Sequence, residues 1–145
     1  MGSEELVLEL GRVLPAPRAV VFAAFRDQER LAQWWGPDGF TVRSLDFSTI
    51  TGEPYRIEMQ PPDGDAFVLH GVFRTVHPPH RLAFTFIWDP PDPDDVETLV
   101  DLSFDDRGEA TEVALWHGEF RTEARLALHR DGWEESFEKL ERLLA

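Results

Sequence analysis

The chain ends with the stretch TEARLALHRDGWEESFEKLERLL, residues 122–144, which contains no proline and carries a regular apolar pattern. This pattern has a period of three or four residues, which places its large side chains on one face of a helix. The acidic residues between them fall on the opposite, solvated face. The stretch therefore predicts a long amphipathic helix that packs on the rest of the protein through Leu126, His129, Trp133, Phe137, Leu140 and Leu144.

Six segments of strand type, separated by turn signals, precede this helix. Two of the turns, Asp63-Gly64 and Arg107-Gly108, are typical of tight hairpins. Consecutive hairpins indicate an antiparallel meander. The predicted strands lie at about residues 40–48, 54–60, 66–76, 81–88, 97–105 and 111–119.

The first part of the chain supplies one more strand and two short helices. Leucines alternate with other residues from Leu6 to Leu10, which is typical of a strand, and Pro15 ends it. The apolar spacing that follows predicts helices at about residues 17–26 and 28–35, and a proline suits the first turn of a helix. No linker or repeat divides the sequence, so we expect a single domain.

Composition and charge narrow the class of protein. The 145 residues include 28 acidic and 14 basic side chains, for a net charge of −14, and no cysteine. This charge argues against nucleic acids and anionic membranes as partners, because both bind basic surfaces. The lack of cysteine excludes disulfides and thiol nucleophiles. The sequence has no signal-peptide pattern and no apolar run of the ~18–20 residues that span a membrane, so we expect a cytoplasmic protein.

Several short stretches occur in a fixed order along the chain. They are LAQWWGP at residues 31–37, YRIEM at 55–59, GVF at 71–73, PPHRL at 78–82, FTFIW at 84–88, TEVALWH at 111–117 and GW at 132–133. With the order of the elements, this set resembles the AHSA1-like family (activator of Hsp90 ATPase homologue 1-like) of the START/Bet v 1-like, or SRPBCC, superfamily. The resemblance implies an α+β helix-grip fold over residues 1–145. In that fold a curved antiparallel sheet of about six or seven strands wraps on the C-terminal helix, with two short helices after the first strand.

The same resemblance implies a function. Domains of this kind look like containers for a small hydrophobic or aromatic molecule, held in a cavity between the sheet and the long helix, and this is the leading hypothesis. The name-giving members of the family bind a chaperone, so a protein-interaction module with a chaperone partner or a homodimer is the second hypothesis. We expect no cofactor in either case.

Aromatic residues on the inward faces are the candidate ligand-binding residues. Alternate side chains of a strand face the same side, so the apolar set of each strand faces the helix. Polar groups among them would orient a bound ligand. The alternative is that the same side chains fill a packed core without a cavity. The predicted ligand-binding residues are Trp34, Phe40, Tyr55, Met59, Phe86, Trp88, His117, Trp133 and Phe137.

His117 is the polar residue on an otherwise apolar inward face. Histidine titrates near neutral pH, so His117 is a candidate general base or ligand anchor, and a cyclase- or hydrolase-type enzyme is the third hypothesis. The alternative is a core histidine hydrogen-bonded to a carbonyl or a tryptophan. No nucleotide-binding loop or serine-hydrolase motif accompanies it. We therefore assign no catalytic residue and favour a protein that is not an enzyme.

Neither the histidines nor the acidic loop has the spacing of a metal site. His77 and His80 are separated by two prolines, and the aspartates of residues 89–95 lack the glycine and glutamate of an EF-hand loop. We therefore expect no metal, and a solvated charged loop at residues 89–95.

Overall fold

The structure is a computed structural model and describes residues 5–145. Its helices and strands follow the predicted order. They are β1 (Leu8–Leu14), α1 (Arg18–Arg26), α2 (Gln28–Trp34), β2 (Thr41–Asp46), β3 (Pro54–Gln60), β4 (Phe67–His77), β5 (Arg81–Asp89), β6 (Thr98–Arg107), β7 (Ala110–Gly118) and α3 (Glu123–Leu144).

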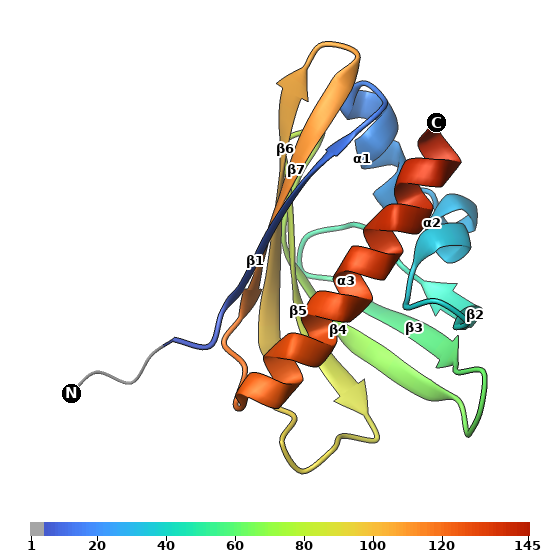
Figure 1. Cartoon of the computed structure of the whole chain (residues 1–145), viewed down its shortest axis with the longest axis vertical. Coiled ribbons are helices and arrows are strands. Elements are labelled where there is room, and N and C mark those ends of the chain that lie inside the picture. The colour runs from blue at the N-terminus through green and yellow to red at the C-terminus, as the bar shows by residue number, and fades with distance from the viewer. Residues whose placement is uncertain (1–4) are drawn as a thin grey trace.

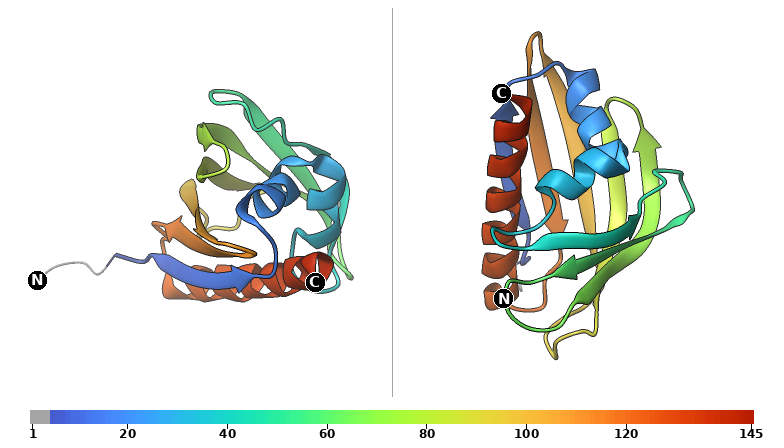
Figure 2. Two further views of the ribbon diagram at one scale, coloured as in Figure 1. Left: turned by 90° about the horizontal axis from the view of Figure 1, so that it is seen from above. Right: turned by 90° about the vertical axis from the view of Figure 1, so that its right-hand side faces the viewer.

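The strands form one antiparallel sheet in the order β1-β7-β6-β5-β4-β3-β2. After the meander from β2 to β7, the first strand therefore adds to the far edge beside the last one. The sheet is curved, and α3 crosses its inner side next to β1, while α1 and α2 cover another part of that side (Figures 1 and 2). The predicted α+β class and helix-grip arrangement are confirmed.

Side-chain caps set the start of two helices. The Asp27 carboxylate accepts hydrogen bonds from the N–H groups of Glu29 (3.0 Å) and Arg30 (3.3 Å), so it separates α1 from α2 at the predicted break. The Thr122 hydroxyl accepts a bond from the Arg125 N–H at 3.2 Å and begins α3. These caps satisfy N–H groups that a helix start leaves without an intrahelical partner.

The predicted inward faces are buried and form one hydrophobic core. In β3, Tyr55 and Ile57 are buried while Arg56 between them is exposed. The predicted face of α3 is buried from His129 to Leu140. The core therefore lies between the inner side of the sheet and the helices, where apolar burial stabilises the fold.

Strands β4 and β5 approach each other closely at Gly71. A Cβ atom at this position would lie 2.0 Å from the carbonyl oxygen of Thr85. That oxygen accepts a hydrogen bond from the Tyr55 hydroxyl at 2.5 Å, and the Thr85 hydroxyl oxygen accepts one from the Val72 N–H at 2.8 Å. Side chains thus supply hydrogen bonds at this point of the sheet, and the space left requires glycine at position 71.

Within residues 5–145, none of the helices combines the length and the apolar character needed to cross a membrane.

Candidate functional site

A cavity of about 400 Å³ lies between α3 and the inner side of the sheet. Its walls come from the loop after α2, from β3, β4 and β5, from the loops that follow β3 and β5, and from one face of α3. Ligand-sized pockets in proteins have volumes of roughly 300–1,000 Å³. The lining residues are Trp35, Gly36, Pro37, Phe40, Met59, Asp65, Ala66, Phe67, Phe86, Trp88, Pro90, Asp92, Asp95, Arg125, Leu128, His129, Gly132, Trp133 and Ser136.

Six aromatic side chains form most of the apolar wall. Trp35 and Trp133 are buried and pack edge to face, with ring centroids 5.3 Å apart. Trp88 packs edge to face on Phe67 at 5.1 Å and on Phe86 at 5.2 Å. Such contacts hold the rings in fixed orientations. The sixth ring, that of Phe40, packs edge to face on Phe67, with ring centroids 6.0 Å apart.

The loop after α2 positions Trp35 by docking on α3. The Gly36 N–H donates to the Ser136 hydroxyl at 3.1 Å, and the Ser136 hydroxyl donates to the Gly132 carbonyl at 2.8 Å. Gly36 has a φ of +97°, and a Cβ atom there would lie 2.8 Å from Met59 Cε. Glycine at this position therefore lets the loop lie tightly between β3 and α3.

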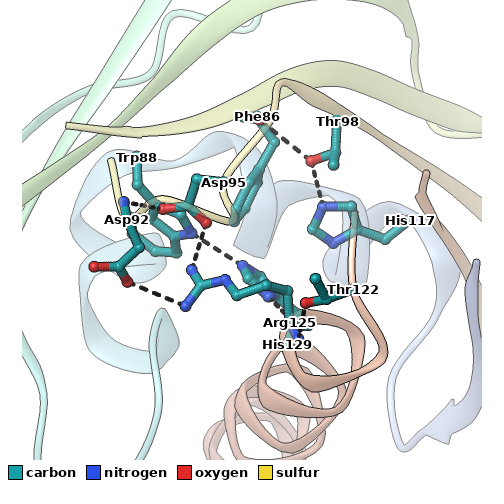
Figure 3. A network of polar contacts seen from close by, with 9 residues as sticks. All are labelled: Phe86, Trp88, Asp92, Asp95, Thr98, His117, Thr122, Arg125 and His129. Carbon is teal, nitrogen blue, oxygen red and sulfur yellow. Dashed lines mark hydrogen bonds and ion pairs between the residues drawn. The ribbon is translucent and has the colours of Figure 1, made fainter. Parts of the chain in front are cut away.

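His129 joins α3 to the aromatic wall. Its Nδ1–H donates to the Arg125 carbonyl at 2.6 Å, and its Nε2 accepts a hydrogen bond from the Trp88 indole N–H at 2.9 Å (Figure 3). Burial lowers the pKa of His129 below its ordinary value, and the Arg125 carbonyl partly opposes that shift. The ring is therefore a neutral imidazole that fixes the position of Trp88.

His117 lies next to His129 but outside the cavity lining. Its Nδ1 accepts from the Trp133 indole N–H at 3.1 Å, which leaves Nε2–H to donate to the Thr98 hydroxyl at 2.8 Å. The Thr98 hydroxyl in turn donates to the Phe86 carbonyl at 3.2 Å. Burial, and then the nearby His129, lower the pKa of His117 well below its ordinary value. This neutral imidazole holds Trp133 in place. His117 is thus a core histidine hydrogen-bonded to a tryptophan, which was the alternative considered from the sequence.

An ion-pair cluster ties the loop after β5 to the start of α3. The Arg125 guanidinium contacts Asp95 at 2.6 Å and Asp92 at 3.2 Å, and the Asp92 N–H donates to the Asp95 carboxylate at 2.7 Å (Figure 3). The Asp95 side chain is only 6% exposed. Asp92 and Asp94 are exposed to solvent, as predicted for this loop. The prediction was wrong for Asp95, because its carboxylate is nearly buried and pairs with Arg125 of α3.

The predicted ligand-binding residues fall into two groups in the structure. Phe40, Met59, Phe86, Trp88 and Trp133 come together in the cavity lining. The other four lie in the packed core outside it, so the structure does not bring them into the same site. These four are Trp34, Tyr55, His117 and Phe137.

Hydrogen bonds explain why two of these four side chains turn away from the cavity. The Trp34 indole N–H donates to the Ala24 carbonyl at 3.0 Å, which fixes the ring between α1 and α2. The Tyr55 hydroxyl is bonded to the Thr85 carbonyl within the sheet. A strand or helix pattern predicts burial for such residues, but the choice between core and cavity depends on these partners.

Sequence reasoning missed several lining residues. Trp35 follows the last residue of α2 and has extended backbone angles, so a helical pattern does not indicate its direction. Phe67 is the first residue of β4, directly after a hairpin loop. His129 was placed on the apolar face of the last helix but was not predicted as a site residue. Its position one turn before Trp133 was the available signal.

Comparisons with known proteins agree with this fold. The family described as Activator of Hsp90 ATPase homolog 1-like protein matches residues 15–145. The solved structure of the AHSA1 protein from Silicibacter pomeroyi is similar, with 29% identity, a TM-score of 0.84, and coverage of 95% of this chain and 96% of that one. A protein from Chromobacterium violaceum shares the fold at 22% identity, with a TM-score of 0.88 and 96% of each chain covered.

No curated protein matches the chain. The family match covers all but the first part of the sequence, including every element from α1 to α3. The chain therefore belongs to the AHSA1-like (activator of Hsp90 ATPase homologue 1-like) family.

Proposed function

We propose that the protein binds a small hydrophobic or aromatic molecule in the cavity between the sheet and α3. The observation that carries this proposal is a cavity of about 400 Å³ with six aromatic side chains in its wall. Packed protein interiors contain few voids larger than a water molecule. A space of this size and composition matches the apolar pockets that hold ligands.

The hydrogen-bonded histidines support the proposal. His117 and His129 each accept an indole N–H, from Trp133 and Trp88 respectively, and so hold two wall residues in place without a ligand. A wall that is already ordered costs less conformational entropy on binding. The polar groups of the site therefore favour a preformed container.

The same geometry gives less support to a reaction at His117. A general base must reach the proton it removes, and it needs a free nitrogen for that. Both ring nitrogens of His117 are engaged, and its ring is not part of the cavity wall. The chaperone partner and the homodimer stay predictions.

A second hollow, of about 710 Å³, lies across β1, β7, β6 and β5, and it is more open. Four charged or hydroxyl side chains, Glu9, Arg81, Asp101 and Ser103, contribute to its lining, and Trp116 is its one aromatic residue. With a single aromatic ring and a more open shape, this hollow would enclose a small molecule less completely than the first cavity. We therefore place the ligand in the aromatic cavity rather than in this shallow hollow.

A cavity-filling variant tests the proposal. Gly132 lies in the cavity wall, and a Cβ atom there would meet only Pro37, at an ordinary contact distance of 3.6 Å. We expect the larger side chain of Gly132→Leu to occupy the space and to weaken binding of 2-naphthylmethanol, an uncharged aromatic probe, at least about tenfold. The measurement is isothermal titration calorimetry.

Ala127→Leu is the matched control, since Ala127 is exposed on the same helix. It should bind the probe as the unchanged protein does. Equal affinity of Gly132→Leu and Ala127→Leu, or no binding of the probe to the unchanged protein, would contradict the proposal.

A further inference from the structure

The charged groups around the cavity are unequal in number. Three carboxylates, of Asp65, Asp92 and Asp95, line it, and Arg125 is the only guanidinium or ammonium group among its described lining residues. His129 adds no charge, because its Nε2 accepts the Trp88 indole N–H and its Nδ1–H donates to a carbonyl. With Arg125 counted, the lining carries two net negative charges.

The positive charge of Arg125 is already matched. Its two terminal nitrogens contact Asp92 and Asp95. Within residues 5–145 its buried Nε–H has no hydrogen-bond partner, so it offers one donor to a water molecule or to a ligand oxygen. The cavity therefore presents no unpaired cation to a negatively charged ligand.

Ligands of different charge should respond differently to this lining. A carboxylate brought among aromatic side chains loses hydration without gaining a counter-charge, which is costly. It is also repelled by Asp65, whose exposed side chain has no ion-pair partner in the described part of the chain. An ammonium group would instead meet carboxylates at the edge of the cavity, and the faces of tryptophan rings attract cations.

We propose that the cavity selects a small aromatic amine, with its ring among Trp35, Trp88 and Trp133 and its ammonium group near Asp65, over a carboxylate of the same shape. This inference rests on the proposed function and names the chemical class of the ligand. The negative charge of the whole protein acts in the same direction, because it raises the local concentration of cations.

Three probes with the same ring test the order of affinities: 2-naphthylmethylamine, 2-naphthylmethanol and 2-naphthoic acid. We expect the amine to bind most tightly in calorimetric titrations at neutral pH, and the acid to bind at least about tenfold more weakly than the alcohol. An acid that binds as tightly as the alcohol would overturn the charge selection and leave the proposed function standing. Binding of none of the three would overturn both.

Two substitutions that each replace a carboxylate by an ammonium group test whether the preference for the amine arises at the cavity. Asp65→Lys places a cation at the cavity edge and should narrow the affinity ratio between amine and acid about tenfold. Glu109→Lys makes the same change at the exposed turn between β6 and β7, at the far end of these strands from the loop after β5 (Figure 1). It should change the ratio little. The same narrowing in both variants would show that the overall charge, and not the cavity lining, sets the preference, and would overturn the proposal.

Discussion

His117 and His129 pack against each other, yet each holds a different tryptophan of the cavity wall. In both, burial favours the neutral ring and lowers the pKa. Their protonation would place an N–H against an indole N–H that already donates. At the residue scale, the site therefore depends on two histidines staying uncharged.

This has a consequence for stability at mildly acidic pH. The unfolded chain takes up protons on its histidines as the pH falls below about 6.5, whereas folded His117, with its lowered pKa, stays neutral. The free energy of unfolding should therefore decrease as the pH falls, by up to about 1.4 kcal/mol per pH unit for each such histidine. Urea unfolding between pH 7.5 and 5 measures this slope.

His117→Phe should remove the contribution of this histidine to the slope. At pH 7.5 the variant should be less stable by about 2 kcal/mol, because the Trp133 indole and the Thr98 hydroxyl lose their partner. His70→Gln is the control, since His70 is exposed on β4. An unchanged slope in His117→Phe would contradict this assignment.

At the scale of elements, β4 and β5 depend on a glycine where they meet. In Gly71→Ala, the new methyl group would lie against the Thr85 carbonyl, which is backbone and has little room to move. We expect a loss of roughly 2–4 kcal/mol in the free energy of unfolding.

The matched control for this substitution is Gly11→Ala in β1, where a Cβ atom meets nothing within 4 Å. That change should leave stability equal or slightly raised, because alanine restricts the unfolded chain. Urea unfolding of both variants compares them. Similar losses in the two would show that close approach at Gly71 is not the cause.

The loop after β5 is attached to α3 by Arg125. In Arg125→Met, the nearly buried Asp95 carboxylate would lose its counter-charge, so the loop should detach. We expect faster amide hydrogen exchange in residues 90–97 and a smaller increase in exchange rate in the strands of the sheet.

Arg107→Met serves as its control, because Arg107 also contacts two carboxylates, those of Asp105 and Glu112, but at an exposed turn. Exposed ion pairs contribute little to stability. Exchange in residues 90–97 should therefore be the same as in the unchanged protein. If amide exchange in residues 90–97 stays slow in Arg125→Met as well, the ion pairs of Arg125 with Asp92 and Asp95 do not hold the loop.

The elements could be predicted from the sequence because local signals specify them. Turns such as Asp63-Gly64 limit each strand, and the helical period of residues 122–144 identifies α3. The direction of Trp35 and the pairing of Asp95 with Arg125 could not be predicted in the same way. Both depend on contacts between segments far apart in the chain.

At the scale of the whole molecule, the curved sheet and α3 leave a cavity that the sequence alone could not distinguish from a packed core. Both arrangements bury the same alternate side chains. The cavity wall also includes the loop after α2 and the loop after β5, which contact α3 through Gly36 and through Asp92 and Asp95. The family resemblance pointed to the cavity, and the residue pattern named five of the residues that line it.

Ligand binding in this cavity is the central claim, and indole N–H signals in a ¹H–¹⁵N NMR spectrum test it most directly. Trp35, Trp88 and Trp133 line the cavity, whereas Trp116 alternates with inward-facing residues of β7 and lines the shallow hollow instead. On addition of 2-naphthylmethanol, the signals of the first three tryptophans should shift in a saturable way while that of Trp116 stays in place. Unchanged signals of Trp35, Trp88 and Trp133, or a shift of Trp116 alone, would contradict the account.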